Sequence, residues 1–598
     1  MAACMNIAKL LWHKRKLLVL VLTPILLCPL PIIIQDTAAL CAYAVLIIAI
    51  YWMTEVLPIA LTALLPVLLF PLLGVMHSAQ VSANYMKDII MTMIGAFFVA
   101  DAMEHWNIHR RFALRILCHT ASTPRWLMFG LMTTTSFLAM WMSNSVVTSM
   151  MVPLAVAILK EINVKRTESQ LPRVANGDAD LELQKDHEES KPIASVTSAT
   201  EQTPASKSGV SDDDFKNLSK GLVLCVAYAA NIGGTATLYG TSSNIVMTGQ
   251  LESLYGYEAT VDFGTWFAYG FPNQLIILII AWLVLQWRFL DLRGLFKLCR
   301  RSRNRRRKHH VPSDAELIIR KQYAELGKMT WAEVIVLVHF IALSLLWLTY
   351  SPRFIPGWSS LFSHQYVTSS TATMAVVISL ALIPSSKPNF LKCGRNQSFN
   401  VEEENADSSP APAILDWRRA SSNMRWEVIF LMGAGYAIAD AFGESGLSDY
   451  LAEQFKVFAT IPAWSLVIVC TVLIAILTEF ISNTATAAVF LPIIGKMGES
   501  IGVNPHYLMI PTTVASSFAF MLPIATPPNA IAFSYGTLTV MDMVKCGLLI
   551  NLASLVVVNL TINTFGVFLF DLNTYPAWAG GTTIQPSLTE NISLVSYS

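Results

Sequence analysis

Apolar residues fall in long runs along this chain, separated by short polar stretches. Runs that approach or reach the roughly 17–25 apolar residues of a membrane-spanning helix cover residues 17–34, 38–53, 275–287, 334–348, 367–383 and 548–569. The sequence lacks the long alternation of apolar and polar residues typical of a membrane β-barrel, so these runs predict helices. The pattern therefore predicts an all-α polytopic membrane protein.

Composition agrees with this pattern. Of all residues, 54% are hydrophobic and only 14% are charged, whereas soluble proteins are about 25% charged. The first run follows the basic stretch HKRK and is not followed by a small-residue cleavage site, so we interpret residues 1–37 as an uncleaved first helix with a cytosolic N-terminus. The nine cysteines form no CxxC pattern, which indicates neither a disulfide framework nor a zinc site.

Polar stretches interrupt the apolar runs. Residues 164–215 and 385–424 have the composition of disordered cytosolic loops, and residues 291–332 contain the basic cluster RRSRNRRRKHH. Between two apolar segments, this cluster indicates a cytosolic linker that obeys the positive-inside rule, and no nucleic-acid partner is expected. In the tail at 572–598, Asn591 begins a glycosylation sequon, which predicts an extracellular C-terminus.

The chain contains an internal repeat. Each copy has a Ser-Asn element and a later element rich in Gly or Pro, which ends at Asn244 in one copy and Asn529 in the other. We therefore divide the chain into a first repeat at 38–290 and a second at 333–571. A shift of 339 residues superimposes, without a gap, Asp88 on Glu427, Asp101 on Asp440, Ser143 on Ser482, Asn144 on Asn483, Ser145 on Thr484 and Pro153 on Pro492.

The order of apolar segments predicts an inverted repeat. Tracing the chain across the membrane gives about 11 helices plus two re-entrant hairpins, near 127–159 and 462–498. This arrangement places both predicted loops and the basic cluster in the cytosol, and it gives the two repeats opposite orientations. Interrupted elements at matching positions of an inverted repeat are typical of a secondary transporter whose site lies near the middle of the membrane.

The repeated Ser-Asn elements would lie at the tips of the hairpins. At such a break, free N–H groups and the positive end of a helix suit an anion, while carbonyl, Asn and Ser oxygens suit a hard cation such as Na⁺. A single Ser-Asn pair would be typical of hydrogen bonding between helices, but its recurrence at symmetric positions favours a site. Asp101 and Asp440 lie near the ends of short apolar runs, which favours interfacial or capping roles over proton transfer.

Nothing in the sequence indicates catalysis or ATP-driven pumping. It contains no phosphate-binding GxxxxGK[ST] motif, and no nucleophile stands with an apparent general base. An enzyme is therefore not predicted.

Several stretches resemble one family of transporters. YWMTEVLP, LAMWMSN, TEFISNTAT and FMLPIATPPNAIAFSYG are similar to segments of the animal sodium-coupled dicarboxylate, citrate and sulfate cotransporters, the solute carrier 13 branch of the divalent anion:sodium symporters. The resemblance implies a homodimer in the plasma membrane, in which a transport domain moves like an elevator against a scaffold. It also implies a divalent anion as substrate and Na⁺ as the coupling ion.

The resemblance also assigns residues to the site. Substrate contacts are expected at Ser143, Asn144, Ser145, Ser482, Asn483, Thr484, Thr526 and Pro527. Sodium contacts are expected at Ser143, Asn144, Gly240, Thr241, Asn244, Ser482, Asn483, Ala525 and Asn529.

The first half departs from the usual pattern of the family. Ser145 replaces a Thr but keeps a hydroxyl, Val147 loses one, and Ser243 stands where dicarboxylate members have Pro, as in sulfate members. The second loop, with Thr526, has the dicarboxylate form. We expect sodium-driven import of a di- or tricarboxylate such as succinate or citrate. Sulfate or another oxyanion is the alternative, and an uncoupled anion channel or sensor is a second.

Overall fold

The computed structural model describes residues 15–120, 123–170, 212–290, 314–351, 357–363, 366–387 and 412–579. All regular elements in these ranges are helices, apart from an isolated bridge between Pro384 and Ala413. The prediction of an all-α fold is therefore confirmed for the described part. The basic cluster, most of both predicted loops and the sequon at Asn591 lie outside the described residues.

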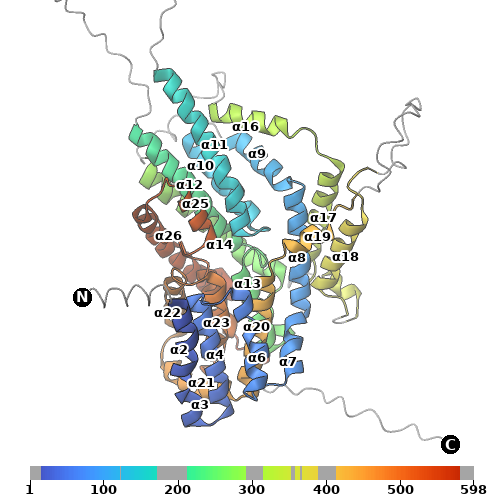
Figure 1. Ribbon diagram of the computed structural model, residues 1–598, viewed down its shortest axis with the longest axis vertical. Helices are drawn as coiled ribbons and strands as arrows, with labels where there is room; N and C mark the ends of the chain where they lie inside the picture. Colours follow the sequence, from blue (N-terminus) through green and yellow to red (C-terminus); the bar gives the residue numbers. More distant parts are fainter. Residues whose placement is uncertain are drawn as a thin grey trace, which may run out of the picture.

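Six helices follow the predicted apolar runs (Figure 1): α2 (Arg15–Leu27), α4 (Thr37–Thr54), α14 (Phe263–Phe289), α17 (Trp331–Leu348), α18 (Ser369–Leu382) and α26 (Val540–Thr561). Two further long helices, α8 (Asp88–His105) and α20 (Trp426–Glu444), lie outside those runs. Shorter helices connect them: α3 (Pro29–Ile34), α5 (Ile59–Thr62), α6 (Leu65–Leu72), α7 (Ser78–Ala83), α9 (Ile108–Thr120), α16 (Asp314–Glu325), α19 (Trp417–Ser422), α21 (Leu447–Phe455) and α27 (Val567–Phe570).

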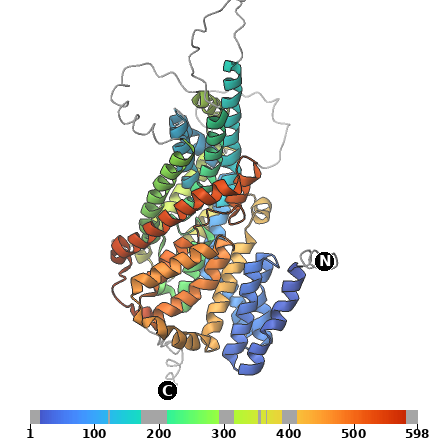
Figure 2. The ribbon, with the colours of Figure 1, turned by 90° about the vertical axis from the view of Figure 1, so that its left-hand side faces the viewer.

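By length and composition, six helices of the described part can each cross a membrane, or up to seven if a bent pair counts as one span. Other predicted spans are shorter, such as the apolar helix Ser369–Leu382, or are interrupted. Helix α9, which contains three arginines, and helix α16, which carries both acidic and basic residues, lie together at the top of Figure 1, where α11 ends and α12 begins. Figure 2 shows α26 crossing the molecule obliquely, with α2, α3 and α4 grouped at one side.

Four interrupted elements form two matching sets. The first half has the hairpin α10 (Pro124–Ala139) and α11 (Asn144–Gln170), followed by the broken pair α12 (Asp212–Gly234) and α13 (Ser242–Tyr255). The second half has the hairpin α22 (Ala463–Leu477) and α23 (Asn483–Ser500), followed by the broken pair α24 (Pro505–Ala515) and α25 (Pro527–Ser534).

The two sets are interleaved. Helix α11 packs against α25 of the other half, and α23 packs against α13. Within each half, the hairpin packs against the first helix of the broken pair, α10 against α12 and α22 against α24. Each hairpin helix that begins at a tip thus lies beside the helix that follows the break in the other half.

Two aspartates join the halves reciprocally. Asp101 Oδ1 accepts a hydrogen bond from Asn423 Nδ2 at 2.9 Å, and Asp440 Oδ2 accepts one from Asn84 Nδ2 at 2.8 Å. Both carboxylates and both amides are related by the 339-residue shift. Arg419 also pairs with Asp101 at 3.0 Å. These contacts favour a structural role for both aspartates, because each carboxylate holds the opposite half in place.

The edges of the predicted loops need correction. Helix α11 continues to Gln170 and α12 begins at Asp212, so residues 164–170 and 212–215 are helical. The first stretch contains Lys, Arg and Glu, which are good helix formers. The second contains three Asp residues, which are favourable in the first turn of a helix. The linker predicted at 291–332 contains α16, and the loop predicted at 385–424 contains α19.

Candidate functional site

The first tip is a short turn between two antiparallel helices. Helix α10 ends at Ala139, and α11 begins at Asn144. Ser143 Oγ and Ser145 Oγ are 2.9 Å apart and hydrogen-bonded, and Val147 N donates to Ser143 O at 3.0 Å. Ser143, Asn144 and Ser145 are all half-buried. The tip therefore exposes a small group of neutral polar atoms at the start of a helix.

The first loop, residues 235–241, lies directly against this tip. Asn244 Nδ2 donates to Thr237 O at 2.8 Å and closes the loop, and Thr237 Oγ1 donates to Met140 O at the tip. A Cβ atom added to Gly234 would lie 2.8 Å from Asn144 Oδ1 and 3.1 Å from Gly240 O. The absence of a side chain at Gly234 thus leaves room for the Asn144 amide and for the Gly240 carbonyl oxygen beside it.

The second loop repeats this geometry. Asn529 Nδ2 donates to Ala519 O at 2.9 Å and to Leu522 O at 3.0 Å. These partners lie ten and seven residues before the asparagine, as Gly234 and Thr237 do for Asn244. The loops that were predicted to match in sequence therefore share the same hydrogen-bonding scheme.

The remaining residues of the second half lie around this loop. Thr526 caps α25 by accepting a hydrogen bond from Asn529 N at 3.4 Å. Ala525 is buried, and Pro527 is exposed at the start of α25. Ser482, Asn483 and Thr484 are half-buried at the second tip, like their counterparts in the first.

A direct contact joins the first half to the second loop. Asn231, near the end of α12, donates from Nδ2 to Thr526 Oγ1 at 3.1 Å and to Asn529 Oδ1 at 3.4 Å. Asn231 is buried, with 1% of its surface exposed. Among the described residues, no hydrogen bond connects one tip with the other. Near the second loop, the first half thus contributes Asn231 and the packing of α11 and α12 on α25.

Several neutral oxygens at the first tip, at the first loop and at Asn231 lack hydrogen-bond partners within the described residues. Within the described part, the buried atoms Asn144 Oδ1, Asn231 Oδ1, Asn244 Oδ1 and Ser243 Oγ have no hydrogen-bond partner. Buried polar atoms are rarely left in this state, because each unpaired group costs free energy. Amide and carbonyl oxygens are the ligands that a hard cation prefers. The residues present therefore fit a sodium ion.

The same places also suit an anion. Helices α11, α13, α23 and α25 begin at the tips or after the loops, and a helix N-terminus carries partial positive charge and free N–H groups. The hydroxyls of Ser145 and Thr484 can donate hydrogen bonds to an oxyanion. Anion and cation partners thus lie next to one another without a basic side chain among the predicted site residues.

Glu479 is a residue of this region that the sequence analysis did not single out. Its side chain is fully buried, and its carboxylate accepts hydrogen bonds from Phe520 N at 2.8 Å, Met521 N at 3.0 Å and Leu522 N at 3.2 Å. Asn551 Nδ2 donates a further bond at 2.7 Å. Glu479 therefore holds the backbone of the second loop. A carboxylate inside an apolar run was the available signal.

Val147 and Ser243, two positions at which the first half departs from the family pattern, lie in different surroundings. Thr486, which matches Val147, donates to Ser482 O of its own helix at 3.0 Å. The hydroxyl lost at Val147 is thus one that serves the helix in the second half. Ser243 is fully buried in α13, where the second half has Pro528.

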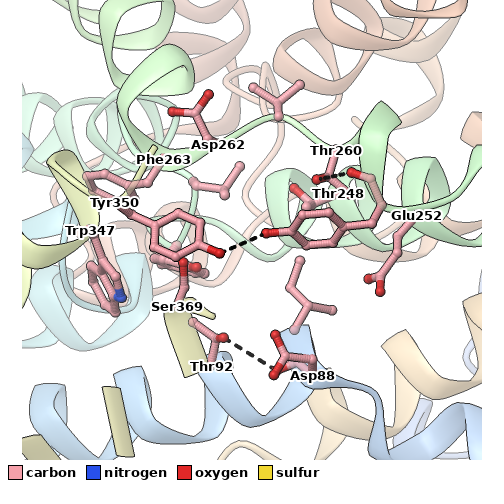
Figure 3. A pocket seen from close by; sticks show the side chains of 15 residues that line it. Asp88, Thr92, Thr248, Glu252, Thr260, Asp262, Phe263, Trp347, Tyr350 and Ser369 are labelled. Carbon is pink, nitrogen blue, oxygen red and sulfur yellow. Dashed lines mark hydrogen bonds between the residues drawn. The ribbon is translucent and has the colours of Figure 1, made fainter. Parts of the chain in front are cut away.

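A partly open cavity of about 70 Å³ lies beside the first loop. Figure 3 shows Asp88, Glu252 and Asp262 around it, with Tyr350 bonded to Tyr257 across one side at 3.2 Å. A dianion would be repelled by three carboxyl groups. The cavity is therefore unsuited to an anionic substrate, in contrast to the neutral tips.

Comparison with known proteins decides the family. The model of the sodium:sulfate symporter transmembrane region matches residues 9–572. The chain belongs to this symporter family. A Na(+)/citrate cotransporter of Mus musculus is 40% identical over 572 residues, covering 95% of this chain and 97% of the relative. The Na(+)/dicarboxylate cotransporter 3 of Homo sapiens is 37% identical over 615 residues, covering 99% of each.

Solved structures are more distant. The Alcanivorax borkumensis YdaH transporter gives a TM-score of 0.47 at 12% identity, covering 82% of this chain and 88% of that one. This likeness is too low to carry an argument. Membership of the symporter family confirms the recognition made from the motifs, and it confirms a membrane transporter in place of an enzyme.

Proposed function

We propose that this chain is a sodium-coupled symporter that imports divalent anions, namely di- or tricarboxylates such as succinate or citrate. The observation that carries the proposal is the pair of matching neutral tips and loops, joined across the halves by Asn231 and Thr526. Relatives that share 37–40% of their residues with this chain are named Na(+)/citrate and Na(+)/dicarboxylate cotransporters, which supports carboxylates as substrates.

The predicted residues would form two overlapping sets, one that binds the anionic substrate and one that binds sodium. For the substrate we assign Ser143, Asn144, Ser145, Ser482, Asn483, Thr484, Thr526 and Pro527. For sodium we assign Ser143, Asn144, Gly240, Thr241, Asn244, Ser482, Asn483, Ala525 and Asn529. Bound Na⁺ would supply the positive charge that offsets the cost of taking a dianion out of water. The tips would orient the anion by N–H and O–H donors.

The wider architecture is part of the same proposal. We infer about 11 spanning helices plus two re-entrant hairpins, a transport domain that moves like an elevator, and a homodimer. The position of α9, with its three arginines, at one end of the molecule supports a cytosolic location for that end. The N-terminus would be cytosolic, and the C-terminus, with Asn591 glycosylated, would lie outside the plasma membrane.

Sulfate is the second candidate substrate. Ser243 supports it, because this buried hydroxyl has no hydrogen-bond partner in the described part of the chain and can donate to a tetrahedral oxyanion. A Pro at this position, as at Pro528 in the second half, cannot do so.

Radiolabelled citrate and succinate uptake in cells that express the chain tests the proposal. Sodium is present or replaced by choline, and excess sulfate is added as a competitor. Sodium-dependent uptake that sulfate does not block would support the carboxylate symporter. Sodium-dependent sulfate uptake without carboxylate uptake would favour the second candidate, and a flux indifferent to the sodium gradient would indicate a channel.

A further inference from the structure

The two halves differ five residues before each tip asparagine. In the second half this residue is Thr478, and in the first half it is Ala139. Thr478 Oγ1 lies 2.6 Å from Ser516 O and 2.7 Å from Asn483 Oδ1. A threonine hydroxyl carries one proton, so it can satisfy only one of these two acceptors at a time.

The oxygens of the Thr478 hydroxyl, the Asn483 amide and the Ser516 carbonyl therefore lie together at the second tip, and the Thr478 hydroxyl supplies the one hydrogen that they share. Thr478 is fully buried, so water does not readily supply the missing donor. An excess of neutral acceptor oxygens at one point is the environment that a hard cation completes. The spacing indicates that Ser516 O and the side chains of Thr478 and Asn483 can turn toward the same ion.

Glu479 adds a carboxyl group next to Thr478 in the chain. It follows Thr478 in the chain, and the hydrogen-bond donors that reach its carboxylate are backbone N–H groups and the amide of Asn551, all of them neutral. A carboxylate in a buried setting interacts strongly with a nearby cation, because little water screens it.

The first half lacks these features. Ala139 offers no hydroxyl, and Met140 stands at the position of Glu479. The tip asparagine is retained, but Asn144 Oδ1 is buried without a hydrogen-bond partner among the described residues. Compared with the second tip, the first has lost one neighbouring oxygen ligand and one negative charge.

We propose that the two sodium sites of this chain are unequal. The second half, through Thr478 and beside Glu479, binds the tighter ion, and the first half binds another ion weakly at Asn144. The inference rests on the proposed sodium coupling and adds to it a difference between the two halves. The missing hydroxyl at Ala139 is the main cause of the weaker site.

Sodium binding to the purified full-length chain, without any substrate, tests this inequality. The unfolding temperature is followed as NaCl replaces choline chloride at constant ionic strength. The wild type is expected to show two phases, each a rise in the slope of unfolding temperature against the logarithm of NaCl concentration as one site begins to fill. Thr478→Ala is expected to shift the tighter phase to at least about tenfold higher NaCl, which corresponds to 1.4 kcal/mol. Thr478→Ser keeps the hydroxyl and is expected to stay within about twofold of the wild type.

The reciprocal change tests the first half. Ala139→Thr restores a hydroxyl and is expected to move the weaker phase to several-fold lower NaCl, approximately merging the two phases. Thr512→Ala serves as the matched control, because this buried hydroxyl of α24 donates only within its own helix, to Leu508 O at 2.7 Å. It is expected to leave both phases in place.

The inequality would be overturned if Thr478→Ala kept the tighter phase, if Thr478→Ser were as damaging as Thr478→Ala, or if Ala139→Thr left the weaker phase unchanged. Should Thr478→Ala fail to fold, Thr478→Ser and Ala139→Thr still decide the question. A single sodium phase together with sodium-dependent uptake would refute only the inequality. Absence of both sodium stabilisation and sodium-dependent uptake would refute the proposed function itself.

Discussion

Asn231 in the first half donates a hydrogen bond to Thr526 Oγ1 in the second half, at 3.1 Å. The same hydroxyl caps α25 by accepting from Asn529 N. Thr526 therefore connects the end of α12 with the helix start that follows the second loop. A substitution of Asn231 should therefore alter the position of Thr526, and a substitution of Thr526 that of Asn231, because neither residue has an exposed alternative partner.

Asn231→Ala is expected to lower sodium-dependent uptake by about tenfold or more, since it removes a buried donor that orients Thr526, a loss of about 1–3 kcal/mol. Uptake is measured together with surface abundance. Asn273→Ala is the matched control, because Asn273 is an equally buried amide that bonds to Tyr269 O and Thr561 instead. Equal uptake by both variants would contradict a role of Asn231 in the site.

The tip asparagines should be essential to transport. Asn144→Ala and Asn483→Ala are each expected to abolish uptake while the protein still reaches the cell surface, because both remove an amide that no neighbouring side chain replaces. The exposed Asn563, on the same chain but outside the tips, provides the control variant Asn563→Ala. Normal transport by either tip variant would refute the assignment of these residues.

Glu479→Gln is expected to destabilise the second loop. Both carboxylate oxygens accept N–H groups, Oε1 from Phe520 and Oε2 from Leu522, so an amide must turn its own NH₂ toward one donor. We expect a loss of about 1–3 kcal/mol, seen as a lower unfolding temperature and reduced uptake. Glu499→Gln makes the same exchange at a partly exposed pair with Lys496 and should cost at most about 1 kcal/mol.

The reciprocal aspartates should stabilise the protein without carrying protons. Asp440→Asn is expected to weaken the contact with Asn84 and lower the unfolding temperature, and Asp101→Asn should do the same through Asn423 and Arg419. The pH profile of any remaining uptake should match that of the wild type. A profile that lost a titration step in either variant would instead indicate a proton pathway.

The stability of the chain should depend on pH through His109, on α9. Burial lowers the pKa of His109 to about 4, although a hydrogen bond with Met103 O opposes the shift. The unfolded chain therefore binds a proton at higher pH than the folded chain. This contribution to stability is fully present above pH about 6.5 and is lost as the pH falls toward 4. His109→Phe should flatten the dependence of the unfolding temperature on pH over that window.

The sequence was informative where the repeat made a local signal appear twice. Ser-Asn pairs with a following Pro predicted the tips, and the paired Asn244 and Asn529 predicted the loops, because a broken helix needs particular residues close in sequence. Glu479 and Thr478 could not be assigned in this way. Their backbone partners, from Ser516 to Leu522, lie about 40 residues away, and the packing of α22 on α24 brings them close.

The ends of helices were also predicted poorly from the sequence. The charged stretch after Leu159 reads as a loop by composition, yet α11 continues through it to Gln170. Isolated propensities of Lys and Glu favour the helix, and a helix already formed in an apolar environment can extend at little further cost.

The interleaving of the halves also constrains how the protein is made. Because α11 lies against α25, and α23 against α13, the first tip has no complete neighbourhood until α25 has been synthesised, more than 350 residues later. Until then, its unpaired polar atoms remain inside or beside the membrane without their final partners. The first half therefore remains incompletely folded until α25 has been synthesised.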